Sequence, residues 1–198
     1  MFLVLLSHLT SVSLPAFELE VLLDPNELDA GGTTALGSTA FTRDGSLMAY
    51  SIAKDGSDWN SIHVRDVSTC MDRKGDSVSW VKFSGIQWLG TYGFFYSSYR
   101  KPSDRPPMGK AAGTETAAAV GQMLCFHMLG TSEQDDIIVV HEPDHPKWRF
   151  SAELSDDDKY LLIYVRETCD PVCRLYMCAL PDIQPACLPD RDRNLYWY

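Results

Sequence analysis

Two segments of this sequence carry side chains of the types that metal or nucleophilic chemistry requires. His141-Glu142-Pro143-Asp144-His145 matches the H-E-x-x-H zinc pattern. That pattern binds zinc only on a helix, where the two histidines share one face. Pro143 lies between the histidines and opposes a helix, and Ile137 to Val140 before them are strand formers. We therefore predict no metal site here.

The nucleophile candidates also lack their partners. Cys169 has no histidine near it in sequence, so a packing or pocket-lining thiol is the expected role. The sequence contains no G-x-S-x-G segment, no phosphate-binding loop and no G-x-G-x-x-G segment. Asp156 to Asp158 forms a short acidic run, which is typical of a solvated hairpin turn and offers too few ligands for calcium. We expect no catalytic residue and no cofactor in this chain.

Composition predicts a globular and acidic protein. The chain has 198 residues, 45% of them hydrophobic, and a formal net charge of −10. An excess of acidic residues argues against nucleic acid, because phosphate binding requires clustered lysine and arginine. The six cysteines, which we expect to be reduced thiols in a cytosolic protein, form no C-x-x-C pair: Cys70, Cys125, Cys169, Cys173, Cys178 and Cys187.

The N-terminal segment resembles the apolar part of a secretory signal. Met1 to Leu6 is apolar, but it has no basic start and no clear cleavage site. It is also too short to span a membrane. We expect a cytoplasmic protein, with secretion as the alternative.

The elements that would position any site belong to an internal repeat. Phe41 to Tyr50 aligns with Leu154 to Ile163, 113 positions later, and the same register pairs Ile62 with Leu175 and Val64 with Met177. Each copy reads strand, acidic turn, strand, polar loop, strand. A weaker middle copy places Trp88 where Phe41 stands, 47 positions earlier.

Units of this kind, repeating every ~40–50 residues, are typical of β-propeller blades. A β-sandwich is the alternative, although it does not require similar units. We predict an all-β fold, an incomplete propeller of about three four-stranded blades. We further expect a strand over Glu18 to Asp24, a polar loop over Cys70 to Ser77 and an exposed insertion over Pro102 to Thr116.

An ordered series of motifs resembles the prolyl oligopeptidase family. The motifs are Leu23-Asp24-Pro25-Asn26, Gly56-Ser57-Asp58-Trp59, Val81-Lys82-Phe83-Ser84, Gly113-Thr114-Glu115-Thr116, Leu129-Gly130-Thr131, Pro146-Lys147-Trp148, Ala152-Glu153-Leu154-Ser155-Asp156-Asp157 and Cys169-Asp170-Pro171-Val172. The resemblance covers residues 20–180 and leaves segments 1–19 and 181–198 unmatched. It implies part of a seven-bladed propeller that restricts access to an α/β-hydrolase domain, in a cytoplasmic enzyme that cuts short peptides after proline.

The resemblance also implies which residues line the substrate pocket. Phe83 and Cys169 match family positions that reach the substrate, and Arg149 stands where the family keeps a methionine. A charge at that position puts the preference for apolar groups upstream of proline in doubt.

The Ser-Asp-His triad of the family lies in the hydrolase domain, which has no counterpart in this sequence. We therefore expect a fragment of a serine endopeptidase, inactive alone, whose parent family acts on short proline-containing peptides. The alternatives are a non-catalytic module that pairs through open sheet edges, with itself or a partner, and a small secreted β-protein. We expect neither nucleic-acid nor membrane partners.

Overall fold

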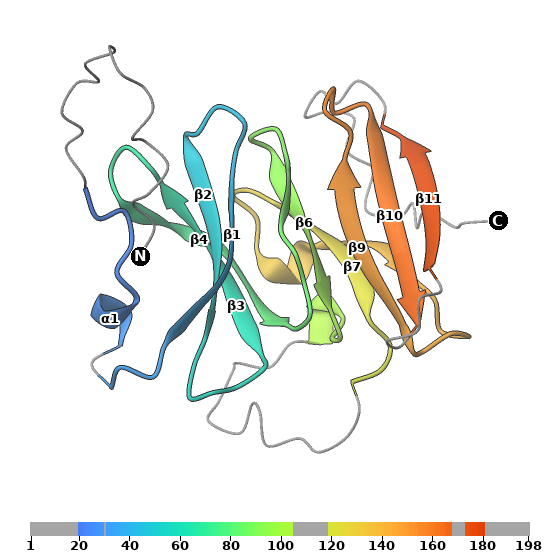
Figure 1. The fold of residues 1–198 in the computed structure, drawn as a ribbon, viewed down its shortest axis with the longest axis horizontal. Coiled ribbons are helices and arrows are strands. Elements are labelled where there is room, and N and C mark those ends of the chain that lie inside the picture. Colours follow the sequence, from blue (N-terminus) through green and yellow to red (C-terminus); the bar gives the residue numbers. More distant parts are fainter. Residues whose placement is uncertain (1–19, 30, 105–118, 168–172, 181–198) are drawn as a thin grey trace, which may run out of the picture.

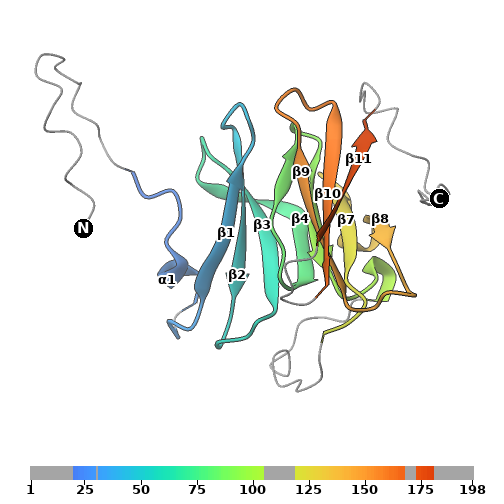
Figure 2. The same ribbon diagram turned by 45° about the vertical axis from the view of Figure 1, so that its right-hand side comes forward.

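The computed structural model describes residues 20–29, 31–104, 119–167 and 173–180. These residues form antiparallel strands in three layers stacked side by side (Figures 1 and 2). The first layer consists of β1(Ala35–Phe41), β2(Leu47–Ala53), β3(Asn60–Asp66) and β4(Met71–Val81). The second layer consists of β5(Gln87–Leu89), β6(Gly93–Ser98), β7(Met123–Met128) and β8(Ile137–His141). The third layer consists of β9(Trp148–Leu154), β10(Tyr160–Glu167) and β11(Cys173–Ala179). A single pairing, Val81 with Ser98, joins the first two layers into one sheet.

The third layer repeats the first in register. Adding 113 to the bounds of β1 and β3 gives the bounds of β9 and β11, and adding it to Leu47 gives Tyr160, where β10 begins. The predicted repeat of consecutive blade-like sheets is confirmed. Within the described residues the third layer has three strands, where four-stranded blades were expected.

The acidic turns of the two copies use the same hydrogen bonds. The Thr42 hydroxyl donates to Asp44 at 2.6 Å, and the Ser155 hydroxyl donates to Asp157 at 2.7 Å. The bond from Ser155, together with the backbone N–H of Lys159, lowers the pKa of Asp157 to about 2. These side chains fix the turns by local bonds, as Ser, Thr and Asp commonly do.

The two turns also contact each other. Arg43 of the first turn lies 3.1 Å from the Asp158 carboxylate of the second. Both side chains are well exposed, so the ion pair contributes little to stability.

Two apolar cores lie between the three layers. Leu47, Ala49, Ile62 and Val64 of the first layer pack against the second, and Leu161, Ile163 and Val165 of the third pack against its other face. A third cluster covers the outer face of the first layer, where Leu22, Leu23 and Leu28 lie on Met48, Tyr50 and Ile52.

Two of the predicted elements are wrong. The described part of the expected strand over Glu18 to Asp24 is not a strand, because Asp24 instead caps a short helix, α1(Pro25–Leu28), by accepting from the Asn26 N–H at 2.9 Å. The expected loop over Cys70 to Ser77 is mostly strand β4, which pairs with β3. Backbone pairing there outweighs the polar character of the sequence.

Among the described residues, no helix is long and apolar enough to cross a membrane. The described cysteines Cys70, Cys125, Cys173 and Cys178 are free thiols. Cys125 is buried in the core, whereas Cys173 lies exposed on β11.

Candidate functional site

Phe83 presents an aromatic ring to solvent from a constrained backbone. It follows β4 directly, its side chain is 54% exposed, and its φ angle is 53°. The left-handed region is costly for a bulky side chain and persists only where the surroundings impose it. Such strain is a reason to look for function at this position.

Gln122 holds the Phe83 loop in place. Its side-chain amide donates to the carbonyl oxygens of Lys82 and Phe83 at 3.2 and 3.4 Å, and its Oε1 accepts from the Phe150 N–H at 2.7 Å. Gln122 is 1% exposed, so these bonds lack competition from water. The amide therefore ties the loop after β4 to the start of β9.

Two cations lie near the Phe83 ring. The guanidinium carbon of Arg149 is 4.6 Å from the ring centroid, and Nζ of Lys82 is 5.3 Å away. Both distances allow cation–π attraction, worth about 0.5–1 kcal/mol at exposed sites. Lys82 also pairs with Asp58 at 3.2 Å, whereas Arg149 is exposed beside the aromatic ring.

A buried aromatic cluster supports this surface from beneath. Trp59 packs edge-on against Trp80 at 5.3 Å and against Tyr99 at 6.1 Å. The guanidinium of Arg100 lies 4.0 Å from the Trp80 ring. Burial raises the pKa of the Tyr99 hydroxyl, so the tyrosine stays neutral near pH 7.

Of the pocket residues predicted from the sequence, the structure brings Phe83 and Arg149 into contact. Cys169 falls within residues 168–172, outside the described part of the chain. The predicted residues did not include Gln122. Its only signal in the sequence is a polar amide directly before the apolar strand β7.

Replacing Gln122 should loosen the Phe83 loop. In Gln122→Ala the carbonyls of Lys82 and Phe83 and the N–H of Phe150 lose their partner, and an unsatisfied buried group costs about 1–3 kcal/mol. We expect faster trypsin cleavage after Lys82 and a lower free energy of unfolding. Gln134→Ala, at an exposed position, is the control. Equal cleavage rates in the two variants would show that Gln122 does not hold the loop.

The H-E-x-x-H segment lacks the helix that zinc binding needs. His141 is the last residue of strand β8, and the His145 ring stacks on Trp148 at 4.0 Å and 3°. Among the described residues, no group of three or more His, Cys, Asp or Glu side chains is placed to hold a metal ion. Pro143 comes two residues after the end of the β-branched strand β8, and the segment continues in turns and not in a helix.

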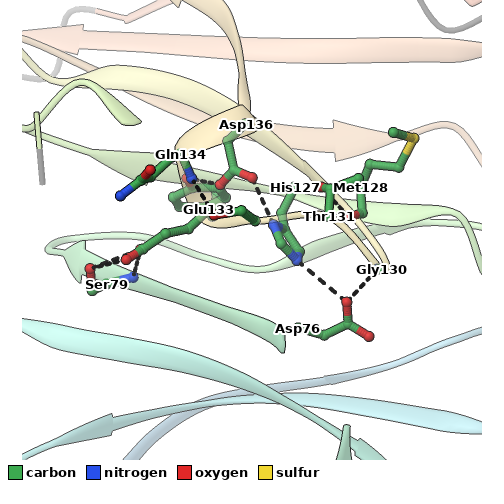
Figure 3. A network of polar contacts seen from close by, with 11 residues as sticks. Asp76, Ser79, His127, Met128, Gly130, Thr131, Glu133, Gln134 and Asp136 are labelled. Atoms are coloured by element: carbon green, nitrogen blue, oxygen red, sulfur yellow. Dashed lines mark hydrogen bonds and ion pairs between the residues drawn. The ribbon is translucent and has the colours of Figure 1, made fainter. Parts of the chain in front are cut away.

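A second polar cluster surrounds the fully buried His127 side chain (Figure 3). Nδ1 of His127 lies 2.7 Å from Asp136, and Nε2 lies 3.8 Å from Asp76. The hydroxyl of Tyr96 donates to Asp136, and the N–H of Gly130 donates to Asp76. Arg73 pairs with Asp76 at 2.7 Å. The cluster thus links β4, β6, β7 and the residues after the short 3₁₀ helix Glu133–Asp135.

The His127 cluster does not have the geometry of a catalytic triad. A histidine oriented by a carboxylate is the base half of such a triad, but its other nitrogen must face a nucleophile. Here that nitrogen faces the Asp76 carboxylate, and the His127 side chain is 0% exposed. We conclude that this cluster stabilises the packing of the first two layers and does not reach a substrate.

Comparison with known proteins gives the family. The family model for the N-terminal β-propeller domain of prolyl oligopeptidase matches residues 9–189. The chain belongs to the prolyl oligopeptidase family. A prolyl endopeptidase from Elizabethkingia meningoseptica is 40% identical over 144 residues, which are 73% of this chain and 19% of that protein. A prolyl endopeptidase from Dictyostelium discoideum is 30% identical over 78% of this chain and 24% of its own length.

Solved structures agree with this assignment. Prolyl oligopeptidase B from Galerina marginata, bound to a macrocyclization substrate of 25 residues, superposes with a TM-score of 0.70 at 30% identity, covering 80% of this chain and 22% of that one. The all-β fold of stacked sheets is therefore an incomplete propeller of the prolyl oligopeptidase type. The chain spans about a fifth of the length of the relatives it matches.

Proposed function

We propose that this chain is the substrate-gating propeller part of a prolyl oligopeptidase-type serine endopeptidase. In this proposal Phe83 and Arg149 form part of the wall that meets a short peptide upstream of its proline, together with Cys169. The observation that carries the proposal is the exposed Phe83 ring, held on a left-handed backbone by Gln122 and covered by the Arg149 guanidinium. A rigid, partly apolar surface of this kind suits recognition of a peptide side chain.

Arg149 changes the chemistry expected of this wall. An exposed guanidinium beside an aromatic ring attracts carboxylates and repels cations. We expect the wall to favour peptides with an acidic residue upstream of proline over peptides with a lysine there.

The isolated chain should not cut peptides. A serine peptidase needs a hydroxyl within hydrogen-bond reach of a base that a carboxylate orients. Among the described residues, the buried His127 faces two carboxylates instead of a hydroxyl. The Ser61 hydroxyl lies 2.9 Å from Nε2 of His63, but in that part of the chain His63 forms no ion pair with a carboxylate that would orient it. A fluorogenic Gly-Pro reporter peptide should therefore show no turnover above buffer, with an intact prolyl endopeptidase as positive control. Turnover that a serine-directed inhibitor blocks would overturn the expected inactivity.

The second candidate is a non-catalytic binding module that pairs through an open sheet edge. The observation that favours it is β11, whose seven residues pair with β10 in unbroken register. Within the described residues, no strand pairs with its other edge. Copurification with an intact prolyl endopeptidase would support this role.

For location we propose the cytoplasm, by analogy with the family. The signal-like segment Met1 to Phe17 lies outside the described residues. Mass spectrometry of the mature N-terminus tests the secreted alternative, which predicts loss of that segment.

A further inference from the structure

We propose that Arg43 forms a strap that holds the first and third layers together and opens when its charge is screened or removed. Arg43 lies in the turn between β1 and β2, and its guanidinium binds the turn between β9 and β10. It lies 3.1 Å from the Asp158 carboxylate and donates to the carbonyl oxygen of Asp156. Both turns lie at the top of the stack in Figure 1. We call these contacts the Arg43 strap, and they do not depend on the gating role proposed for Phe83.

The internal repeat shows that the two turns differ in the charges that form the strap. Adding 113 to Arg43 gives Asp156, and adding 113 to Gly45 gives Asp158. The equivalent turn of the second layer, residues 89–93, contains no charged residue. Because the first and third turns carry opposite charges, they attract each other, whereas two identical acidic turns would repel.

Asp158 occupies a backbone position that favours glycine. Its φ angle is 56°, and Gly45 at the equivalent place in the first turn has a φ angle of 72°. The first turn thus uses the residue that adopts the left-handed region most readily, whereas the third layer holds a longer side chain there. The neighbouring Asp157 is already bound by the Ser155 hydroxyl and the backbone N–H of Lys159. Asp158 therefore supplies the carboxylate of the strap at a cost in backbone energy.

The strap lies at one end of the strands that begin the three layers. These strands are β1, β5 and β9, and β5 contacts both of the others. In a propeller the blades stand radially around a central channel, which their first strands line. At the opposite end of the same layers, the Arg149 guanidinium of the third layer lies 4.6 Å from the Phe83 ring of the first. The two layers are thus connected at both ends, and the Arg43 strap is the connection that depends on an ion pair.

The exposure of the strap predicts that it opens readily. The side chains of Arg43 and Asp158 are 64% and 36% exposed, so dissolved salt screens their attraction. Exposed ion pairs of this kind shift an equilibrium by about 1.5–5-fold. The strap therefore biases the first and third layers towards the closed arrangement without locking them, and ionic strength controls how often they separate.

Pulsed EPR distances between the first and third layers test the proposal. Spin labels carried by unnatural residues at Ser68 and Lys159, which are exposed and lie beside or within the two turns, avoid the native cysteines. In the 198-residue chain, the ratio of short to long distances should fall about 1.5–5-fold between roughly 0.05 and 1 M salt. Arg43→Gln and Asp158→Asn should each cause a similar fall at low salt. Lys74→Gln, which removes a charge at an exposed position on β4, is the matched control and should leave the distances unchanged.

Two results would overturn the proposal. Equal distance distributions in the parent chain, Arg43→Gln and Asp158→Asn would show that the ion pair does not hold the layers. An equal effect of salt in Asp158→Asn, where the ion pair is gone, would assign the effect to another part of the chain. The salt titration needs no variant of the strap, so it decides the question even where a substitution prevents folding. Neither result bears on peptide cleavage, so the reporter assay remains an independent test of the gating proposal.

Discussion

Gly93→Ala should destabilise this protein by about 3 kcal/mol or more, because a methyl group has no room at that position. A Cβ atom built on Gly93 would lie 2.0 Å from the carbonyl oxygen of His127 and 2.8 Å from the Phe126 ring. The first obstacle is backbone of the paired strand β7, so it cannot rotate away. Strand β6 would have to separate from β7 in the centre of the fold.

Urea unfolding followed by tryptophan fluorescence measures this change as a lower midpoint. Gly85→Ala is the control, because a Cβ atom there meets no heavy atom within 4 Å. Similar midpoints for the two variants would mean that β6 and β7 move apart at little cost, which contradicts tight packing of the second layer.

The sequence predicted the arrangement of strands well where the repeat was strong. The 113-residue offset sets the register of Phe41 with Leu154 and of Val64 with Met177, and the structure keeps both pairs on equivalent strands. Periodicity is informative where a strand buries alternate side chains against one neighbouring layer, as β3 and β10 do.

Local composition was misleading where long-range pairing decides the structure. Met71 to Ser77 is polar and contains Gly75, yet it forms the first half of β4 because β3 supplies the hydrogen bonds. The short helix α1 was also not predicted, because it depends on the capping carboxylate of Asp24.

The sequence indicated the exposed residues of the candidate site but not the buried residues that hold them in place. Phe83 and Arg149 could be identified because the residues beside them match motifs of the family. Gln122 and His127 lie beside or within an apolar strand. Gln122 depends on partners 28 to 40 residues away, and His127 contacts both the distant Asp76 and Asp136, nine positions along the chain. No periodicity in the sequence encodes such contacts.

Replacing His127 should have the other large effect, a loss of about 3–5 kcal/mol in the free energy of unfolding in His127→Ala, because the buried Asp136 carboxylate loses the imidazole that lies 2.7 Å from it. Asp76 would keep Arg73 and the Gly130 N–H, and Asp136 would keep the Tyr96 hydroxyl, but both carboxylates would lose the imidazole. His141→Ala, at the exposed end of β8, is the control and should change stability by less than about 0.5 kcal/mol.

A double variant separates the lost interaction from the lost volume. If the cost of His127→Ala comes from the lost contact with the Asp136 carboxylate, then adding Asp136→Asn should cost less than it does in the parent chain, by about 1–3 kcal/mol. Strict additivity would mean that the imidazole acts mainly by filling space beside Phe94, whose ring centroid is 5.2 Å from its own. His127 lies on β7 and Asp136 directly precedes β8, so subadditive costs would show that a polar contact within the second layer, and not only apolar packing, carries the effect.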